Sequence, residues 1–187
     1  ITDTLGERGF AFVDVRPRVN RDRDDLTIDV TYEIREGPRV FVERIDIGGN
    51  VRTLDTVIRR EFTLDEGDAF NTAKLRRTRQ RLQDLGFFAR VDVNNNPGSA
   101  PDRTVISVDV QEQSTGELSI GAGFSSTAGA LSDLTIRERN LLGRGQDLRF
   151  STTLAAKQQQ VDLSFTEPYF LGRELAAGVD AFYRKTD

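Results

Sequence analysis

The sequence contains no cysteine, histidine, methionine or tryptophan among its 187 residues. The absence of cysteine excludes disulfides and thiol nucleophiles, and the absence of histidine excludes imidazole-based acid–base catalysis. Ordinary zinc sites, which use the same two residue types, are excluded with them. The net charge of −4 also lacks the strong basic excess that is typical of nucleic-acid-binding proteins. We therefore expect no enzyme activity, no cofactor, no metal site and no nucleic-acid partner.

Methionine is missing even at the first position, because the chain begins with Ile1. This indicates a processed product or a piece of a longer protein. The sequence also has no run that approaches the ~20 apolar residues of a membrane-spanning helix, and no charged-then-apolar leader. A transmembrane β-strand needs only about 9–11 residues of alternating polarity, so membrane strands remain compatible with this composition.

The composition changes at residues 113–116, Gln-Ser-Thr-Gly. The part before this point is dense in charged residues, whereas the part after it holds half of the 16 glycines. An internal repeat organises the first part. Gly-Phe followed by Val-Asp-Val occurs within residues 9–15 and again within residues 86–93, and Ile-Asp-Val at residues 28–30 recurs as Val-Asp-Val at residues 108–110. A period of about 80 residues suits a small duplicated domain better than a solenoid unit of 20–50 residues.

The later copy of the repeat is complete and predicts the element order β-α-α-β-β. β-branched residues at 40–47 indicate a strand, which ends at residues 48–50, Gly-Gly-Asn. Thr53 or Asp55 is expected to cap a first helix that runs to about Glu61.

The second predicted helix of this copy begins at Asn71 or Thr72 and ends at Gly86, which suits a C′ glycine. Its apolar face consists of Leu75, Thr78, Leu82 and Leu85. Two strands follow, near residues 87–94 and 104–112, and a turn rich in asparagine, proline and glycine joins them.

Two clusters of charged residues lie in this helical region. The first is a basic run on the second helix, formed by Lys74, Arg76, Arg77, Arg79 and Arg81. It surrounds three sides of the helix, which favours a solvated or partner-facing surface over phosphate binding. The second cluster consists of Arg59, Arg60, Glu61, Asp65 and Glu66. Carboxylates this dense could serve acid–base chemistry, but no second motif supports it, so an exposed loop is the preferred interpretation.

Beyond residue 114 the sequence alternates between apolar and polar residues in five segments. The segments centre on residues 117–124, 134–137, 148–154, 161–165 and 175–183. Alternation over segments of this length is typical of the strands of a transmembrane β-barrel. A soluble antiparallel sheet with one wet face has the same period, so periodicity alone leaves both interpretations open.

Several motifs in this order resemble the BamA family of outer-membrane insertases, in which periplasmic POTRA domains precede a barrel. Residues 82–88, Leu-Gln-Asp-Leu-Gly-Phe-Phe, resemble the end of a POTRA second helix. Residues 113–124 resemble the passage from the last POTRA domain into the first barrel strand. Residues 139–145, Arg-Asn-Leu-Leu-Gly-Arg-Gly, and 166–170, Thr-Glu-Pro-Tyr-Phe, resemble early barrel motifs.

The resemblance implies a function without covalent chemistry. The family's barrel parts between its first and last strands and exposes a strand edge that can template a client strand by β-augmentation. Here the first barrel strand would carry this role, through Leu118, Ile120, Gly121, Gly123 and Phe124. Its glycines would weaken a seam that must open, although outer-membrane strands carry small residues in any case.

The resemblance also implies two contact surfaces on the complete POTRA domain. An accessory outer-membrane lipoprotein would contact the loop after the first helix, through Arg59, Arg60, Glu61 and Glu66. An edge strand of the sheet would accept further chains, through Phe87, Phe88, Val91 and Val93.

The expected fold is therefore α+β POTRA domains (β-α-α-β-β) followed by the first antiparallel strands of a transmembrane β-barrel. Residues 1–37 would form the C-terminal part of one POTRA domain, supplying the end of a helix and two strands. Residues 38–113 would form the complete last POTRA domain, and residues 114–187 about five barrel strands. Five strands cannot close when the smallest such barrels have about eight, so a fragment is expected.

The implied location is the bacterial outer membrane, with the POTRA domains in the periplasm, the barrel in the lipid bilayer, and unfolded outer-membrane proteins as clients. Two alternatives from other classes remain. A two-partner secretion porin would join POTRA domains to a barrel and export one dedicated substrate. A soluble β-rich binding module would use the alternating strands as an ordinary sheet.

Overall fold

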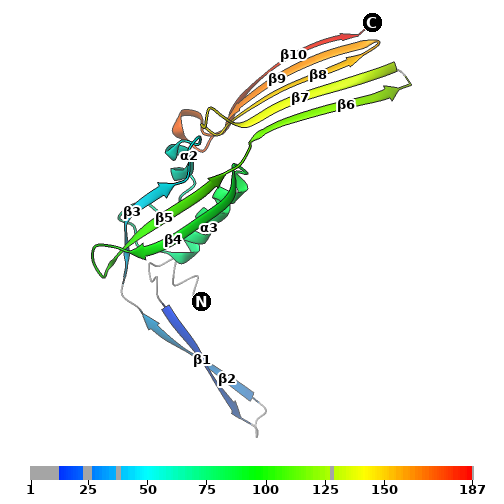
Figure 1. Ribbon diagram of the computed structural model, residues 1–187. Helices are drawn as coiled ribbons and strands as arrows, with labels where there is room; N and C mark the ends of the chain where they lie inside the picture. The colour runs from blue at the N-terminus through cyan, green and yellow to red at the C-terminus, as the bar shows by residue number, and fades with distance from the viewer. Residues whose placement is uncertain (1–12, 23–26, 37–38, 127–128, 187) are drawn as a thin grey trace. The chain divides into compact units, whose positions relative to one another are not determined.

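The computed structural model describes residues 13–22, 27–36, 39–126 and 129–186 (Figure 1). Contacts divide the chain into two compact units. One unit takes the described residues up to Gly49, with Glu61–Leu85 and Arg90–Gln111, and the other takes Asn50–Arg60, Gly86–Ala89 and the described residues from Glu112 onward. In these described ranges, no helix is long and apolar enough to span a membrane, and no acidic cluster forms a metal site. The predicted domain boundaries at 37/38 and 113/114 stay predictions.

The first two strands form a hairpin. β1 (Val13–Asp22) pairs antiparallel with β2 (Thr27–Glu36). Their register places Val19 opposite Val30, so apolar residues of both strands share one face. The two strands expected at the end of the incomplete repeat are thereby confirmed, whereas the helix end expected before them lies outside the described residues.

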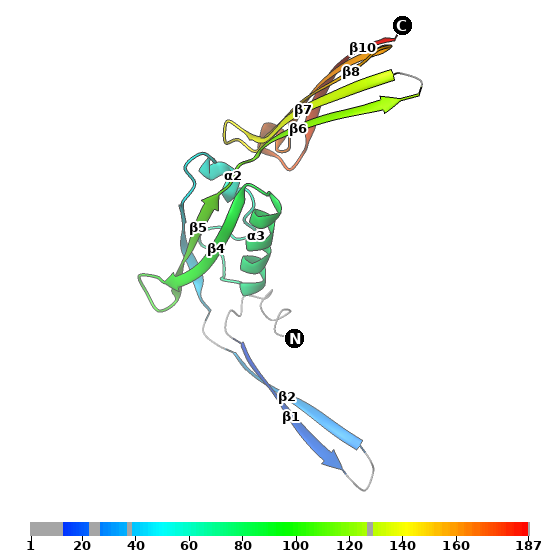
Figure 2. The same cartoon turned by 45° about the vertical axis from the view of Figure 1, so that its right-hand side comes forward.

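The complete repeat folds in the predicted order β-α-α-β-β. β3 (Phe41–Gly48) is followed by α2 (Asp55–Arg59), α3 (Thr72–Asp84), β4 (Phe88–Pro97) and β5 (Arg103–Glu112). The sheet order is β3-β5-β4, and β3 runs parallel to β5. A parallel pair needs a crossover connection, which the helical segment between the strands supplies. The views in Figures 1 and 2 agree in showing α3 alongside this sheet.

The core of this repeat is built from β-branched and leucine side chains of the sheet and of α3. Its buried members include Val42, Ile45, Leu75, Leu82, Val91, Ile106 and Val108. Each fully buried side chain of this size stabilises the fold by about 1.5–3 kcal/mol. Asn71 begins α3 as expected, because its Oδ1 accepts hydrogen bonds from the amides of Ala73 and Lys74 at 2.8 and 3.0 Å.

The first predicted helix differs from expectation at its cap. α2 begins at Asp55, and its N-cap residue Leu54 makes no side-chain capping bond. The hydroxyl of Thr53 instead accepts a hydrogen bond from the Asn140 amide at 2.9 Å. The expected cap from Thr53 or Asp55 is therefore wrong. The Thr53 oxygen accepts from a residue 87 positions later, and Asp55 lies inside the helix, where its Oδ1 accepts a hydrogen bond from Asn50 Nδ2.

Residues after 114 form a five-stranded antiparallel sheet, as predicted. Its strands are β6 (Gly116–Ser125), β7 (Gly129–Leu141), β8 (Gln146–Ala155), β9 (Gln158–Glu167) and β10 (Ala177–Thr186). The order β10-β9-β8-β7-β6 pairs each strand with its neighbour in sequence. A short 3₁₀ helix, η1 (Phe170–Gly172), lies between β9 and β10.

The turn after β3 generates a prediction about the repeat's stability. Gly49 has a φ of +84°, and a Cβ there would overlap the Val110 carbonyl oxygen. Gly67 has a similar φ of +93° but open space around it. We expect Gly49→Ala to lower the free energy of opening of β3 and β5 by about 3 kcal/mol, and Gly67→Ala by only about 1 kcal/mol. Hydrogen exchange of the β3 and β5 amides measures the difference, and equal losses would contradict it.

Candidate strand-pairing site

The five-stranded sheet has one apolar face and one polar face. On the apolar face, the apolar residues of neighbouring strands lie opposite one another. One such row consists of Leu118, Ile136, Phe150, Leu163 and Ala181. The polar face carries rows such as Ser119, Thr135, Ser151 and Asp162. On the polar face, Arg137 forms an ion pair with Asp147, with Nη2 and Oδ2 separated by 2.5 Å. The predicted alternation is thus continuous from strand to strand.

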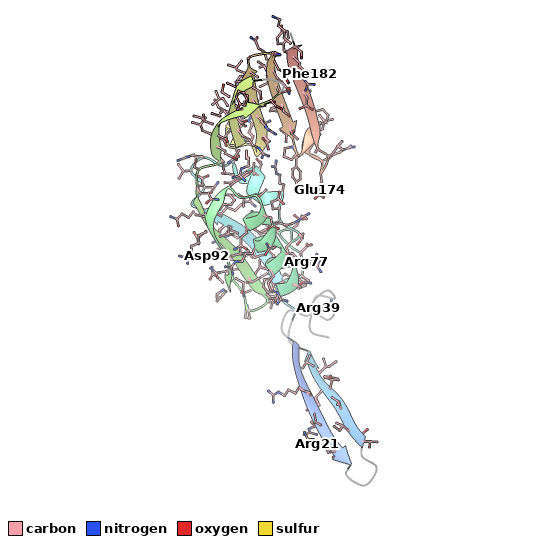
Figure 3. All side chains as sticks on the ribbon, turned by 90° about the vertical axis from the view of Figure 1, so that its right-hand side faces the viewer. Arg21, Arg39, Arg77, Asp92, Glu174 and Phe182 are labelled. Atoms are coloured by element: carbon pink, nitrogen blue, oxygen red, sulfur yellow. The ribbon has the colours of Figure 1, made fainter. Side chains whose placement is uncertain are left out.

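The apolar face is exposed rather than covered by another layer of the described chain. On β6 the exposed fractions of Leu118, Ile120 and Phe124 are 65%, 75% and 82%. Phe182 departs from the pattern, because its register places it beside Asp162 on the polar face, where it is 77% exposed (Figure 3). An exposed apolar surface of this extent marks contact with a partner or a membrane.

β6 forms one edge of this sheet. Its ten residues pair with β7 from Gly116, opposite Glu138, to Ser125, opposite Gly129. On its other side β6 has no strand neighbour among the described residues. An edge of this kind presents a row of backbone donors and acceptors, which is a template for another strand. The predicted gate residues, Leu118, Ile120, Gly121, Gly123 and Phe124, all lie on this edge strand.

The glycines of β6 are not required by its backbone geometry. Neither Gly121 nor Gly123 has a positive φ. A Cβ at Gly121 would lie 3.6 Å from the Cβ of Asp133, and one at Gly123 would lie 3.4 Å from Leu131 Cδ1. Both are ordinary contacts, so alanine fits at either position and the hypothesis that the glycines weaken this strand can be tested directly.

The two edges of the three-stranded sheet differ in whether other residues cover them. The outer edge of β3 is covered, because Val42 donates to Asp68 O at 2.9 Å and its own carbonyl accepts from Gly67 N at 2.7 Å. The carboxylate of Glu66 also accepts a hydrogen bond from the Ile45 amide at 3.1 Å. β4 forms the opposite edge.

The residues predicted to form the POTRA edge strand lie on or beside β4. Phe87, Phe88 and Val91 are buried, and Val93 is half-buried. The side chains of Phe87, Phe88 and Val91 therefore belong to the fold's interior. Any pairing at this edge would use the β4 backbone rather than these side chains.

The predicted lipoprotein-binding residues differ in exposure. Arg59 and Glu66 are exposed, whereas Glu61 is buried, with 6% of its surface exposed. Arg60 is half-buried, and its guanidinium carbon lies 4.1 Å from the centre of the Tyr169 ring. Arg59 and Arg60 belong to one compact unit and Glu61 and Glu66 to the other.

Sequence reasoning missed the role of four polar residues near the start of β6, namely Thr53, Glu112, Glu138 and Asn140. The Glu112 carboxylate accepts hydrogen bonds from the amides of Arg52 and Thr53 at 3.0 and 2.7 Å. Burial alone would raise the pKa of the Glu112 carboxyl, but these hydrogen bonds outweigh it and hold the pKa below its ordinary value. The available sequence signal for Asn140 was a polar residue two positions before a turn that contains two glycines, at residues 142–145.

Comparisons with known families match both parts of the chain. Residues 40–113 match the POTRA family, described as a surface antigen variable number repeat. Residues 140–187 match the Omp85 superfamily domain.

Curated relatives match nearly the whole chain. The outer membrane protein assembly factor BamA of Nitratidesulfovibrio vulgaris is 35% identical over 97% of this chain and 23% of its own length. BamA of Neisseria meningitidis serogroup B is 29% identical over 100% of this chain and 24% of its own length. The chain thus spans about a quarter of the length of the curated relatives it matches.

Solved structures share the fold. BamA from Haemophilus ducreyi lacking POTRA domains 1–3 is 29% identical, covers 100% of this chain and 35% of its own, and has a TM-score of 0.87. CdiB from Escherichia coli is 16% identical over 98% of this chain and 34% of its own, with a TM-score of 0.57. The second likeness shows the fold alone.

The geometry of β6 generates a prediction about strand strength. Gly121→Ala adds a side chain that fits against Asp133, so it should strengthen the β6–β7 pairing by about 0.5–1 kcal/mol. Ala122→Gly is the complementary variant and should weaken the pairing by a similar amount. Hydrogen exchange of the β6 amides in the intact protein measures both. Unchanged protection in Gly121→Ala would show that glycine does not weaken this strand.

Proposed function

This chain belongs to the family of POTRA and Omp85 superfamily proteins that includes BamA, and on that premise we propose that it acts in the assembly and insertion of outer-membrane proteins. The protein resides in the bacterial outer membrane, with its POTRA domains in the periplasm. It performs no covalent chemistry. What it supplies is a strand edge on which an unfolded client begins to pair.

The observation that carries this proposal is the open edge of β6 beside an exposed apolar face. An unpaired backbone amide or carbonyl is costly in hydrocarbon, so a client strand gains by pairing before it enters the bilayer. β6 is ten residues long, and every second residue directs its backbone N–H and C=O to the open edge. The apolar face on which Leu118, Ile120 and Phe124 lie contacts lipid, while the polar face lines the barrel interior.

The same exposed face argues against a soluble binding module. Leu118, Ile120 and Phe124 would each leave most of their surface in water, and soluble proteins rarely expose a contiguous apolar surface of this size. The secretion-porin alternative has weaker support, because the likeness to CdiB is limited to the fold.

The POTRA repeat takes part through two surfaces. The β4 edge receives extended client segments through its backbone, since the opposite edge at β3 is covered by residues 66–70. The accessory lipoproteins contact the exposed members of the predicted cluster, Arg59 and Glu66. Glu61 and Arg60 support the local structure, because one is buried and the other packs on Tyr169.

Cross-linking tests the role of β6 directly, because this chain has no cysteine of its own. Ser119→Cys places a thiol on β6, and Ser151→Cys places one in the same row of the polar face on β8, an interior strand. In the full-length protein we expect a client with single cysteines along one strand to form disulfides with position 119 at least about tenfold more than with position 151. Equal yields at the two positions would show that β6 does not template the client.

Charge reversal tests the lipoprotein contact. Arg59→Glu replaces an exposed cation with an anion, so we expect recovery of accessory lipoproteins with the full-length protein to fall several-fold. Arg79→Glu makes the same change on the exposed side of α3 and serves as the matched control. Recovery is measured by co-purification from detergent extracts of membranes. Equal recovery in both variants would exclude Arg59 from the contact.

A further inference from the structure

A chain of side-chain hydrogen bonds begins at the residue that precedes β6. The Thr115 hydroxyl donates to Glu138 Oε1, and the Thr115 carbonyl accepts from Arg139 N at 3.3 Å. The same Glu138 oxygen accepts from the Asn140 amide N–H at 2.8 Å. The start of β6 is therefore tied to the end of β7 by more than their shared ladder.

Asn140 extends this chain in two directions through its side chain. Its Nδ2 donates to Thr53 Oγ1 at 2.9 Å, and its Oδ1 accepts from Gly145 N at 2.8 Å. Asn140 is 9% exposed and Thr53 2%. A buried amide–hydroxyl pair fixes geometry, because either partner left alone would keep its desolvation cost without its hydrogen bond. Thr53, Asn140, Glu138 and Thr115 together are called the root relay below.

The turn between β7 and β8 is shaped to meet the segment that holds Thr53. Leu54 N donates to Gly143 O at 2.9 Å. Gly143 has a φ of +72°, and a Cβ there would overlap the Arg52 carbonyl oxygen. The backbones approach so closely that only glycine fits at this position.

A second contact holds the same segment from the other side. The Arg60 guanidinium stacks on Tyr169. Tyr169 is held in turn by Glu167, whose carboxylate accepts from Tyr169 N at 3.0 Å and from Gln146 Nε2 at 2.7 Å. Residues 50–60 are thus fastened at both ends to turns of the five-stranded sheet, and they belong to its compact unit.

The two ends of β6 differ in how they are held. The end near Thr115 is fixed by the root relay and by the Gln113 amide, which donates to Phe87 O at 3.0 Å. Toward the other end the ladder to β7 continues, and Phe124 is 82% exposed. A strand fixed at one end has a defined register there, and a shift of one residue would move every side chain to the opposite face.

We propose that Thr53 and Asn140 are positioning residues that fix the first half of β6, residues 116–120, and so set the register in which an incoming strand pairs. This inference rests on the proposed role of β6 as the strand that pairs with clients. This first half of β6 is a preorganised template, so β6 itself loses less conformational freedom when a client strand pairs with it than a mobile edge would lose.

The first test compares Thr53→Val with Thr53→Ser in the full-length protein in bilayer nanodiscs. Valine keeps the shape of threonine but leaves the Asn140 amide without its acceptor, whereas serine keeps the hydroxyl. We expect Thr53→Val to raise hydrogen exchange of the amides of residues 116–120 about tenfold. Exchange at residues 121–124 and in β8 should stay unchanged, and Thr53→Ser should behave as the parent protein does.

A second pair of variants breaks the relay without touching its side chains. Gly143→Ala forces the turn away from Arg52, and Gly172→Ala has the same φ of +72° with open space around it. Only Gly143→Ala should raise exchange at residues 116–120. This pair also decides the question if Thr53→Val fails to fold.

Unchanged exchange at residues 116–120 in a folded Thr53→Val or Gly143→Ala protein overturns the proposal. A uniform rise across β6, β8 and β9 also overturns it, because the relay would then stabilise the whole sheet rather than position one strand. These measurements need no client. Failure of client cross-linking at position 119 would instead refute the proposed function, so the two results are distinguishable.

Discussion

Backbone hydrogen bonding is the constraint on which this structure depends. Every amide and carbonyl of a strand needs a partner, and in a bilayer no water is present to supply one. β7, β8 and β9 have strand neighbours on both sides, whereas β6 and β10 have one neighbour each in the described sheet. β6 is therefore, with β10, one of the two strands of the described sheet that have the most free energy to gain from another chain. The apolar face of β6 is suited to lipid, and the free energy gained by pairing backbone groups is largest in lipid because no water is present to pair with them.

In the three-stranded sheet, the backbone groups of one edge strand find their partners in a loop. The loop at residues 66–70 supplies backbone hydrogen-bond partners to the outer edge of β3, and the Glu66 carboxylate accepts a hydrogen bond from the Ile45 amide. The outer edge of β4 has no strand neighbour in the described sheet, and Phe88 and Val91 of this strand are buried. β4 therefore presents its backbone to another chain. Backbone pairing is tolerant of sequence, which suits a surface that would receive many different unfolded chains.

Much of the fold could be predicted because the signals are local. The alternation in β6–β10 has a period of two whatever the strand packs against, and Asn71 caps α3 through amides only two and three residues away. The roles of Thr53 and Glu61 could not be predicted in this way. Thr53 resembles a helix cap in sequence, but its partner Asn140 lies 87 residues further on. Glu61 sits among charged neighbours that suggest an exposed loop, yet it is buried. Tertiary contact decides both, and local patterns do not record it.

The motif at residues 139–145, which carried part of the family resemblance, has a physical explanation in the contact between its turn and residues 52–54. Leu142 and Gly143 both have positive φ, at 54° and 72°, yet only the second must be glycine. Leu142 is 78% exposed and bears the backbone strain with its side chain in open space. Gly143 faces the Arg52 carbonyl, where no Cβ fits. The turn's conformation alone would accept another residue there at a cost of about 1–2 kcal/mol. It is the contact with residues 52–54 that requires glycine, so the motif reflects that contact as much as the turn itself.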